Sequence, residues 1–147
     1  MATSGWDKVF ESPSTCQDMS SSPTTRRVRP NLVYEIDDYI TIIFNDCEHK
    51  RERVVVETIF YGELYFSNAE FEEFINTFDS FNTCWMDINI IIGKYTTVFT
   101  RNGAKRSLKF YDAFTDKYMF RWTEKLIRLF SKHTCELYKL NRKWFPE

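Results

Sequence analysis

Glycine and proline are scarce in this chain, at four residues each among 147, and histidine is scarcer still, at two. This composition excludes collagen-like repeats, and an aromatic content of 18% excludes a chain that is disordered throughout. No apolar run approaches the roughly 18–20 residues of a membrane-spanning helix, and no apolar signal segment follows Met1. We therefore expect a globular domain that is neither secreted nor anchored by a transmembrane segment.

The sequence also lacks the short motifs that carry catalysis or cofactor binding. It contains no GxGxxG, GxxxxGK[ST], HExxH or DxDxDG pattern. Neither His49 nor His133 has a Ser or Cys placed as in a nucleophilic triad. We predict a protein that is not an enzyme and that has no cofactor and no small-molecule substrate.

Two short Cys/His pairs are the nearest approach to a metal site: Cys47 with His49, and His133 with Cys135. The second pair falls in a segment that we predict to be helical, where residues two apart point to nearly opposite sides. Its two side chains cannot bind one ion, so we predict no metal site and four reduced, mostly buried cysteines.

Charge is distributed unevenly, although the formal net charge is only −1. Residues 1–100 contain 8 Lys and Arg against 16 Asp and Glu, a net charge of −8, whereas residues 101–147 contain 12 against 5, a net charge of +7. Such a division is typical of a chain whose basic part meets an anionic partner, although the two parts can equally neutralise each other within one fold.

Residues 1–30 are predicted to form a flexible tail ahead of a single domain at 31–147. Ten of the fourteen residues from Ser12 to Thr25 are Ser, Thr or Pro, a composition that buries too little apolar surface to offset chain entropy. Trp6, Val9 and Phe10 form an apolar island in this tail that could fold back on the domain or dock on a partner.

The domain combines strand-like and helix-like segments. Runs rich in β-branched and aromatic residues predict strands over 32–36, 39–44, 53–66, 84–92, 94–100 and 106–111. A short middle helix is predicted after an N-cap at Ser67 and Asn68, since apolar residues share one helical face at Phe71, Phe74, Ile75, Phe78 and Phe81. The expected fold class is α+β, in the order ββαβββα, with one antiparallel sheet of about five strands.

The most basic predicted element is one long amphipathic helix from Asp116 to about Arg142, whose apolar face includes Trp122, Leu126 and His133, the last read as a hydrogen-bonded core residue. A second face carries a basic stripe of Lys117, Arg121, Lys125, Arg128, Lys132, Lys139 and Lys143. Asn102 and Gly103 give the strongest hairpin signal in the chain. The tip of that hairpin adds a basic finger of Arg101, Lys105 and Arg106. We predict that these ten residues bind an anionic partner.

The order of the segments resembles that of rhabdovirus matrix proteins: a tail, a strand region at Arg53–Phe66, a helix opened by Ser67 and Asn68, and a strand region at Trp85–Ile92. The small size and the basic helical end are similar to the small matrix proteins of bornaviruses. The resemblance covers residues 30–142 by element order alone, and no functional residue is transferred. It implies a viral structural protein of the cytoplasm or the virion that self-assembles, contacts a nucleocapsid and associates with membranes.

Two interpretations of function follow. In the first, the protein is a structural or adaptor protein that self-associates through its acidic and basic parts and meets an anionic surface, a nucleocapsid or a membrane, through the basic helix. In the second, it binds single-stranded nucleic acid such as RNA, with Tyr34, Tyr39, Phe60 or Tyr65 stacking on bases. A viral accessory protein that binds a host protein is a further alternative.

Overall fold

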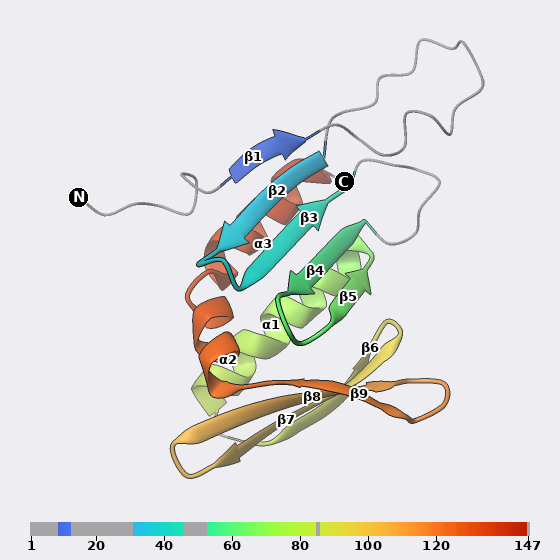
Figure 1. The fold of residues 1–147 in the computed structure, drawn as a ribbon, viewed down its shortest axis with the longest axis vertical. Helices are drawn as coiled ribbons and strands as arrows, with labels where there is room; N and C mark the ends of the chain where they lie inside the picture. The colour runs from blue at the N-terminus through green and yellow to red at the C-terminus, as the bar shows by residue number, and fades with distance from the viewer. Residues whose placement is uncertain (1–8, 13–30, 46–52, 85, 147) are drawn as a thin grey trace.

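The computed structural model of the chain describes residues 9–12, 31–45, 53–84 and 86–146 (Figure 1). Its elements follow the order β1 to β5, α1, β6 to β9, α2 and α3. The α+β class is therefore confirmed. The single sheet of about five strands is wrong, because the strands form two antiparallel sheets, one of five strands and one of four.

The first sheet is a meander in which each strand pairs with the next along the chain. Its strands are β1 (Val9–Ser12), β2 (Asn31–Ile36), β3 (Ile40–Phe44), β4 (Val54–Thr58) and β5 (Glu63–Phe66). Asp37 and Asp38 form the turn between β2 and β3 with φ values of 48° and 64°, which Asp tolerates better than most residues. β1 lies within the segment predicted as a tail and pairs with β2, so part of the apolar island does fold back on the domain.

The second sheet holds β6 (Ile88–Ile92), β7 (Tyr95–Asn102), β8 (Lys105–Asp112) and β9 (Tyr118–Trp122). The predicted hairpin is confirmed: Gly103 and Ala104 join β7 to β8, and Gly103 adopts a φ of 63°. Figure 1 shows this sheet at one end of the molecule, with the helices and the first sheet all on one side of it. Its other face therefore has no element packed on it among the described residues.

α1 (Asn68–Cys84) is the predicted middle helix, and with 17 residues it is not short as expected. Its N-terminus is fixed by a capping box, in which Ser67 Oγ accepts the Glu70 N–H at 3.1 Å and Glu70 Oε1 accepts the Ser67 N–H at 2.9 Å. Its Phe residues are fully buried, as predicted, and they serve both sheets: Phe74 stacks on Phe66 of β5, and Phe78 meets an aromatic ring of β7 edge-on. One helix thus supplies the apolar cover for the inner faces of two separate sheets.

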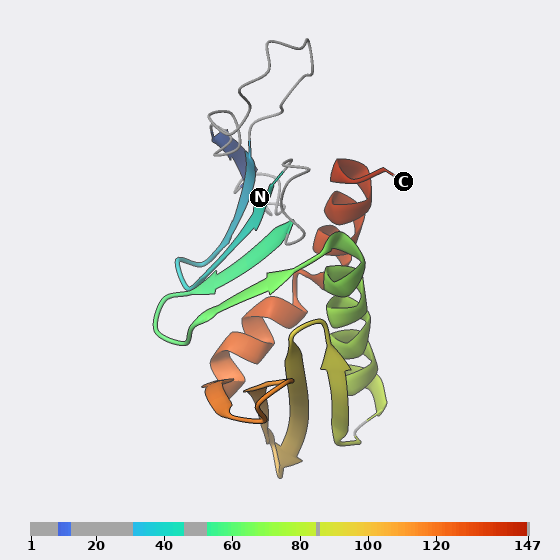
Figure 2. The same cartoon turned by 90° about the vertical axis from the view of Figure 1, so that its right-hand side faces the viewer.

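The single helix predicted from Asp116 to about Arg142 is wrong. Its first part is β9, and the rest is divided into α2 (Glu124–Ser131) and α3 (Thr134–Trp144), which runs beside α1 (Figure 2). Tyr118–Trp122 contains three aromatic residues, which suit a strand, and it pairs with β8. Trp122 is fully buried as predicted, but it reaches the core from a strand.

The helical pattern then breaks at His133, where α3 begins. The Tyr34 hydroxyl lies 2.8 Å from His133 Nδ1, within hydrogen-bond distance. The expectation of a hydrogen-bonded histidine is confirmed, although the residue stands at a helix junction instead of inside one long helix. α2 and α3 therefore present their basic residues in different directions.

Candidate functional site

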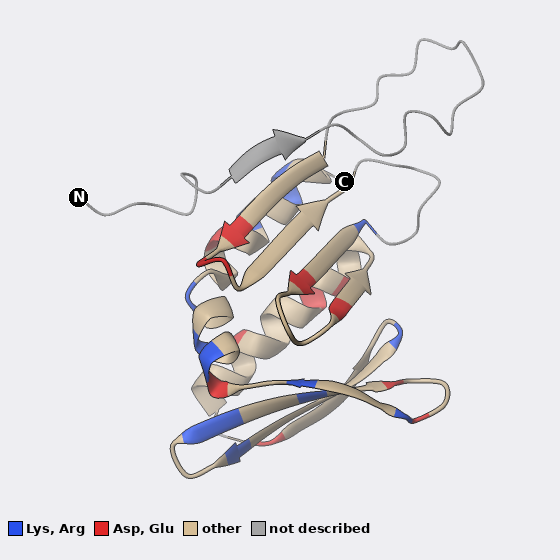
Figure 3. Ribbon diagram, viewed as in Figure 1, with Lys and Arg blue, Asp and Glu red and all other residues tan. Residues whose placement is uncertain are grey.

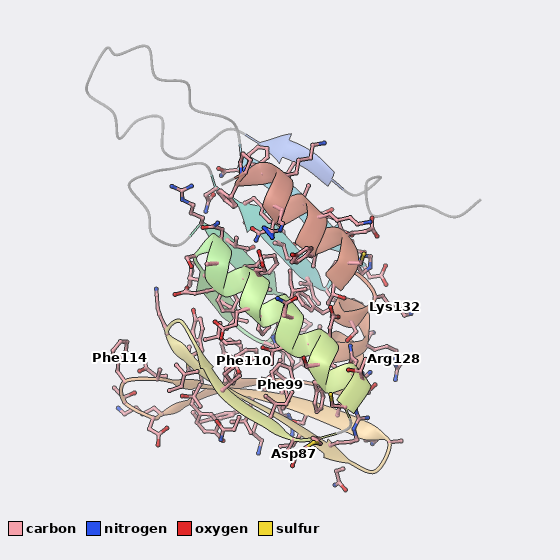
Figure 4. The ribbon with its side chains drawn as sticks, turned by 180° about the vertical axis from the view of Figure 1, so that it is seen from behind. Asp87, Phe99, Phe110, Phe114, Arg128 and Lys132 are labelled. Carbon is pink, nitrogen blue, oxygen red and sulfur yellow. The ribbon has the colours of Figure 1, made fainter. Side chains whose placement is uncertain are left out.

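The ten predicted cationic residues do not form one stripe. Lys117 lies in the turn between β8 and β9, at the end of the sheet marked by Phe114, whereas Arg128 in α2 and Lys132 at its C-cap lie at the other end (Figure 4). Lys139 and Lys143 are exposed on α3, on a different element again. The structure brings together four of the ten around one cavity: Lys105, Arg106, Arg121 and Lys125.

Arg106 is held in a network that joins the β7–β8 hairpin to α2. Its Nε and Nη2 donate to the two carboxylate oxygens of Glu124 at 3.0 and 2.8 Å, and Nη1 donates to Asn82 Oδ1 at 2.8 Å. This hydrogen bonding by Arg106 is the main reason that the pKa of Glu124 falls to about 2. Because the side chain of Arg106 is only 16% exposed, its principal role is to fix α2 on the sheet.

Two further cations make contacts within the fold. The Arg101 guanidinium lies 5.1 Å from the centre of the Phe81 ring and donates to the Phe81 carbonyl at 3.4 Å. Lys125 Nζ donates to the Tyr39 hydroxyl at 2.7 Å and lies 4.0 Å from the centre of that ring, which ties α2 to the turn between β2 and β3. Of the predicted basic finger, Lys105 is the residue with an exposed side chain.

The free face of the second sheet, which we call the outer face, carries three cations. Strand alternation and burial assign to it every second residue of β6 to β8 and the matching residues of β9. These residues are Asn89, Ile91, Thr96, Val98, Thr100, Asn102, Lys105, Ser107, Lys109, Tyr111, Tyr118 and Arg121. Cations thus occupy three of these outward positions and carboxylates none, and Figure 3 shows the blue segments along β8.

Two rows across the outer face combine charge with aromatic surface. Lys109 lies directly opposite Arg121, a pairing of like charges that is unfavourable unless an anion or solvent screens it. In the next row Tyr111 and Tyr118 pack edge-on with ring centres 5.7 Å apart, and Tyr118 is 57% exposed. Lys109 was not among the predicted residues, although Lys105, Ser107 and Lys109 alternate along a predicted strand and therefore share one face of it.

At the α2 end, the outer face is hollowed into a cavity of about 410 Å³. Its lining residues are Thr100, Asn102, Lys105, Arg106, Ser107, Arg121, Thr123, Glu124 and Lys125. Ser107 Oγ is buried there without a hydrogen-bond partner. Thr123 precedes α2 without capping it by a side-chain hydrogen bond. The cavity therefore offers cations and hydroxyl groups to an anion.

The four aromatic residues predicted to stack on bases do not lie on the outer face. Tyr34 is buried, which raises the pKa of its hydroxyl, and Tyr39 lies under Lys125. The Tyr65 hydroxyl donates a hydrogen bond to Glu63 Oε1, and this bond is the main reason that the pKa of Tyr65 rises to about 12. Phe60 is 78% exposed, but it belongs to the turn between β4 and β5.

Of the residues considered for metal binding, Cys16, Cys47 and His49 lie outside the described residues. Cys84 and Cys135 are free thiols, and both are exposed, so the expectation of buried cysteines is wrong for these two. Within the described part of the chain, no three His, Cys, Asp or Glu side chains gather as metal ligands. None of the helices described there combines the length and the apolar character that a bilayer crossing requires.

No protein family, no curated protein and no solved structure matches this chain. The outer face is therefore interpreted from its own chemistry.

Proposed function

We propose that this is a non-enzymatic binding protein whose outer face takes single-stranded nucleic acid. The observation that carries the proposal is the composition of that face. Three cations, Lys105, Lys109 and Arg121, share it with two tyrosines, and its outward strand positions hold no carboxylate. Cations along a surface with neighbouring aromatic rings are the means by which proteins hold single strands without reading their sequence.

The charged row of the outer face suits the phosphates of a single strand, and the aromatic row suits its bases. Lys109 and Arg121, opposite each other on β8 and β9, neutralise phosphates, which also removes their mutual repulsion. Tyr118 offers an exposed ring on which a base can stack, and its edge-on contact with Tyr111 limits the ring's freedom before binding. Each stacked base contributes about 1–3 kcal/mol to binding.

The cavity at the α2 end accepts one phosphate group of the bound strand. Arg106 is already neutralised by Glu124, so Lys105, Arg121 and Lys125 supply the remaining attraction. The buried hydroxyl of Ser107 gains a hydrogen-bond partner in the complex. This arrangement fixes where along the sheet the strand is held.

The test is fluorescence anisotropy with a labelled oligouridine at low salt. The double variant Lys109→Gln with Arg121→Gln should bind at least about tenfold more weakly, and Tyr118→Ala should weaken binding by roughly 5-fold to 100-fold. Lys139→Gln is the matched control, because Lys139 is an exposed cation on α3, away from the outer face. Equal affinity of all variants, or binding to anionic vesicles but not to the oligonucleotide, would contradict the proposal.

Self-association is the second candidate, and the acidic surface of α1 favours it. Glu73 and Asp79 are exposed on this helix, which lies on the opposite side of the second sheet from the outer face. Opposite charges on two separate surfaces favour head-to-tail contacts between copies, as the implied matrix-like role requires. Light scattering of the nucleic-acid-free protein tests it: oligomers should form at low salt and dissociate in the variant Lys109→Glu.

A further inference from the structure

β6 is an edge strand of the second sheet, and its free side carries unpaired main-chain groups. A two-residue turn at Gly93 and Lys94 joins β6 to β7, so Ile92 and Tyr95 form a hydrogen-bonded pair. Hydrogen-bonded and non-hydrogen-bonded pairs alternate along an antiparallel ladder. Ile90 therefore exchanges main-chain hydrogen bonds with β7, whereas Asn89 and Ile91 do not. The Ile90 carbonyl indeed faces β7, where it accepts the Thr97 hydroxyl at 2.8 Å. The N–H and C=O groups of Asn89 and Ile91 therefore point away from the sheet.

The edge strands β5 and β9 are protected, whereas β6 is not. On β5, the Tyr65 N–H donates to the Tyr95 hydroxyl at 2.7 Å, and on β9 a register irregularity and Arg121 disrupt regular pairing. β6 has the sequence Ile-Asn-Ile-Ile-Ile, without charge, proline or bulge. Its Ile91 side chain is 60% exposed. An edge of this kind is a template for an added strand.

A groove runs beside this edge between β6 and α1, which lie side by side in Figure 4. It has a volume of about 410 Å³ and is lined by Ala69, Glu72, Glu73, Asn76, Thr77, Ser80, Ile88 and Ile90. The α1 residues lie at the spacing of one helical face, and from the first to the last they span about 16 Å. This length matches about five residues of an extended strand.

The groove has an apolar floor and an acidic wall. The floor is made by Ile88 and Ile90, which are only partly buried, and the wall carries the carboxylates of Glu72 and Glu73. Arg142 approaches Glu72 at 4.0 Å from an exposed position, so that contact is weak. A basic segment with alternating apolar residues complements both surfaces, because successive side chains of a strand point to opposite sides.

We propose that this groove binds an extended, basic segment of a partner polypeptide, which adds to β6 as a fifth strand of the second sheet. The main-chain groups of Asn89 and Ile91 pair with the segment, and Glu72 and Glu73 attract its Lys or Arg side chains. The β6 strand of a second copy fits less well. Pairing two copies of this edge would bring the acidic walls of both grooves to one junction.

The test uses a fluorescent peptide that alternates Arg and Val, with a peptide that alternates Glu and Val for comparison. The basic peptide should bind at concentrations below about 1 mM, and the acidic one should not. Asn89→Pro should weaken binding by at least about tenfold, because proline removes an N–H that points to the free edge. The matched control Asn89→Thr keeps that N–H and should bind normally.

Two further measurements complete the test. Glu72→Gln with Glu73→Gln should weaken binding about tenfold without any change in the backbone, which keeps the proposal falsifiable if the proline variant does not fold. Hydrogen exchange at the amides of Asn89 and Ile91 should slow when the peptide is bound. Unchanged exchange at both amides, or equal affinity of the carboxylate variant, would overturn the proposal. A dimer of the free protein that Asn89→Pro dissociates would overturn it in favour of a second copy.

Discussion

The ion pair between Arg106 and Glu124 joins a hairpin to a helix that are 18 residues apart in the chain. Each partner makes several hydrogen bonds in the pair, and both side chains are mostly covered. Such a pair is costly to break, because the remaining partner keeps a charge that has lost its counterpart. We therefore assign Arg106 to the stability of the site rather than to direct capture of an anion.

This pair predicts an acid-sensitive component of stability. The pKa of Glu124 lies at about 2, below its ordinary value of 4.5, so the ionised carboxylate stabilises the folded state above pH 4.5. That contribution should be lost as the pH falls from about 4.5 to about 2. Glu124→Gln should cost roughly 1.5–3 kcal/mol at neutral pH and should flatten the pH dependence of unfolding in this window. Urea unfolding at several pH values measures both the loss of stability and its pH dependence. If the stability of the native protein and of Glu124→Gln changed in parallel with pH, the role assigned to Glu124 would be wrong.

Glycine at position 62 is required by a close contact as well as by its backbone conformation. Its φ is 87°, and a Cβ there would lie 2.3 Å from Cε2 of the Phe120 ring. Gly62→Ala should therefore destabilise the fold by roughly 1–3 kcal/mol and shift the turn between β4 and β5. Gly103→Ala is the matched control, because Gly103 has a similar φ of 63° with no atom near the new Cβ. Equal losses of melting temperature in the two variants would show that the Phe120 contact has no effect.

At the scale of elements, the sequence predicted what local signals determine. α1 has a capping box and a periodic apolar face, and the β7–β8 hairpin has an Asn-Gly signal, so both could be predicted. β9 could not, because Tyr118–Trp122 shares its apolar spacing with a helix, and only its pairing with β8 decides the matter. At the break between α2 and α3, His133 contacts Tyr34, which lies 99 residues away in the chain, and local patterns do not predict such a contact.

Long-range strand pairing also explains why only part of the candidate site could be predicted from the sequence. Lys105 and Arg121 could be singled out from their charge alone, but their meeting at one cavity depends on the register of β8 against β9. Lys109 was missed because the basic residues were grouped by helical spacing, and on a strand the relevant spacing is two. Charge predicted an anionic ligand, whereas the pairing of the strands defines the surface that we propose binds it.

Trp122 is the side chain that anchors β9. It is fully buried, and its ring lies 5.5 Å from that of Phe130 on α2 and 5.6 Å from that of Phe110 on β8. Trp122→Ala should cost about 3–5 kcal/mol through the cavity it leaves. Met119→Ala, on the same strand but 39% exposed, should cost less than about 0.5 kcal/mol. Comparable losses from both variants in chemical unfolding would show that β9 is not held by its tryptophan.

At the scale of the whole molecule, the uneven charge of the sequence becomes two surfaces on opposite sides of one sheet. The outer face is basic, and the groove between α1 and β6 on the inner side has an acidic wall. The two surfaces share the sheet but have no lining residue in common. The two binding proposals are therefore compatible, because an anionic strand on the outer face and a basic segment in the groove would not compete for the same residues.

The salt dependence of binding reports how many cations of the outer face meet phosphates. If Lys105, Lys109 and Arg121 each neutralise one phosphate of a single strand, the logarithm of the association constant should fall with the logarithm of the salt concentration with a slope of about −2. Replacing any one of them by Gln should make the slope shallower by about 0.7. Tyr118→Ala should weaken binding at every salt concentration and leave the slope unchanged, because stacking releases no counterions. Lys139→Gln on α3 should change neither quantity. Anisotropy titrations over a series of salt concentrations measure both the affinity and the slope for each variant. If Lys139→Gln and Lys109→Gln changed the slope equally, the whole surface of the protein, rather than the outer face, would attract the strand.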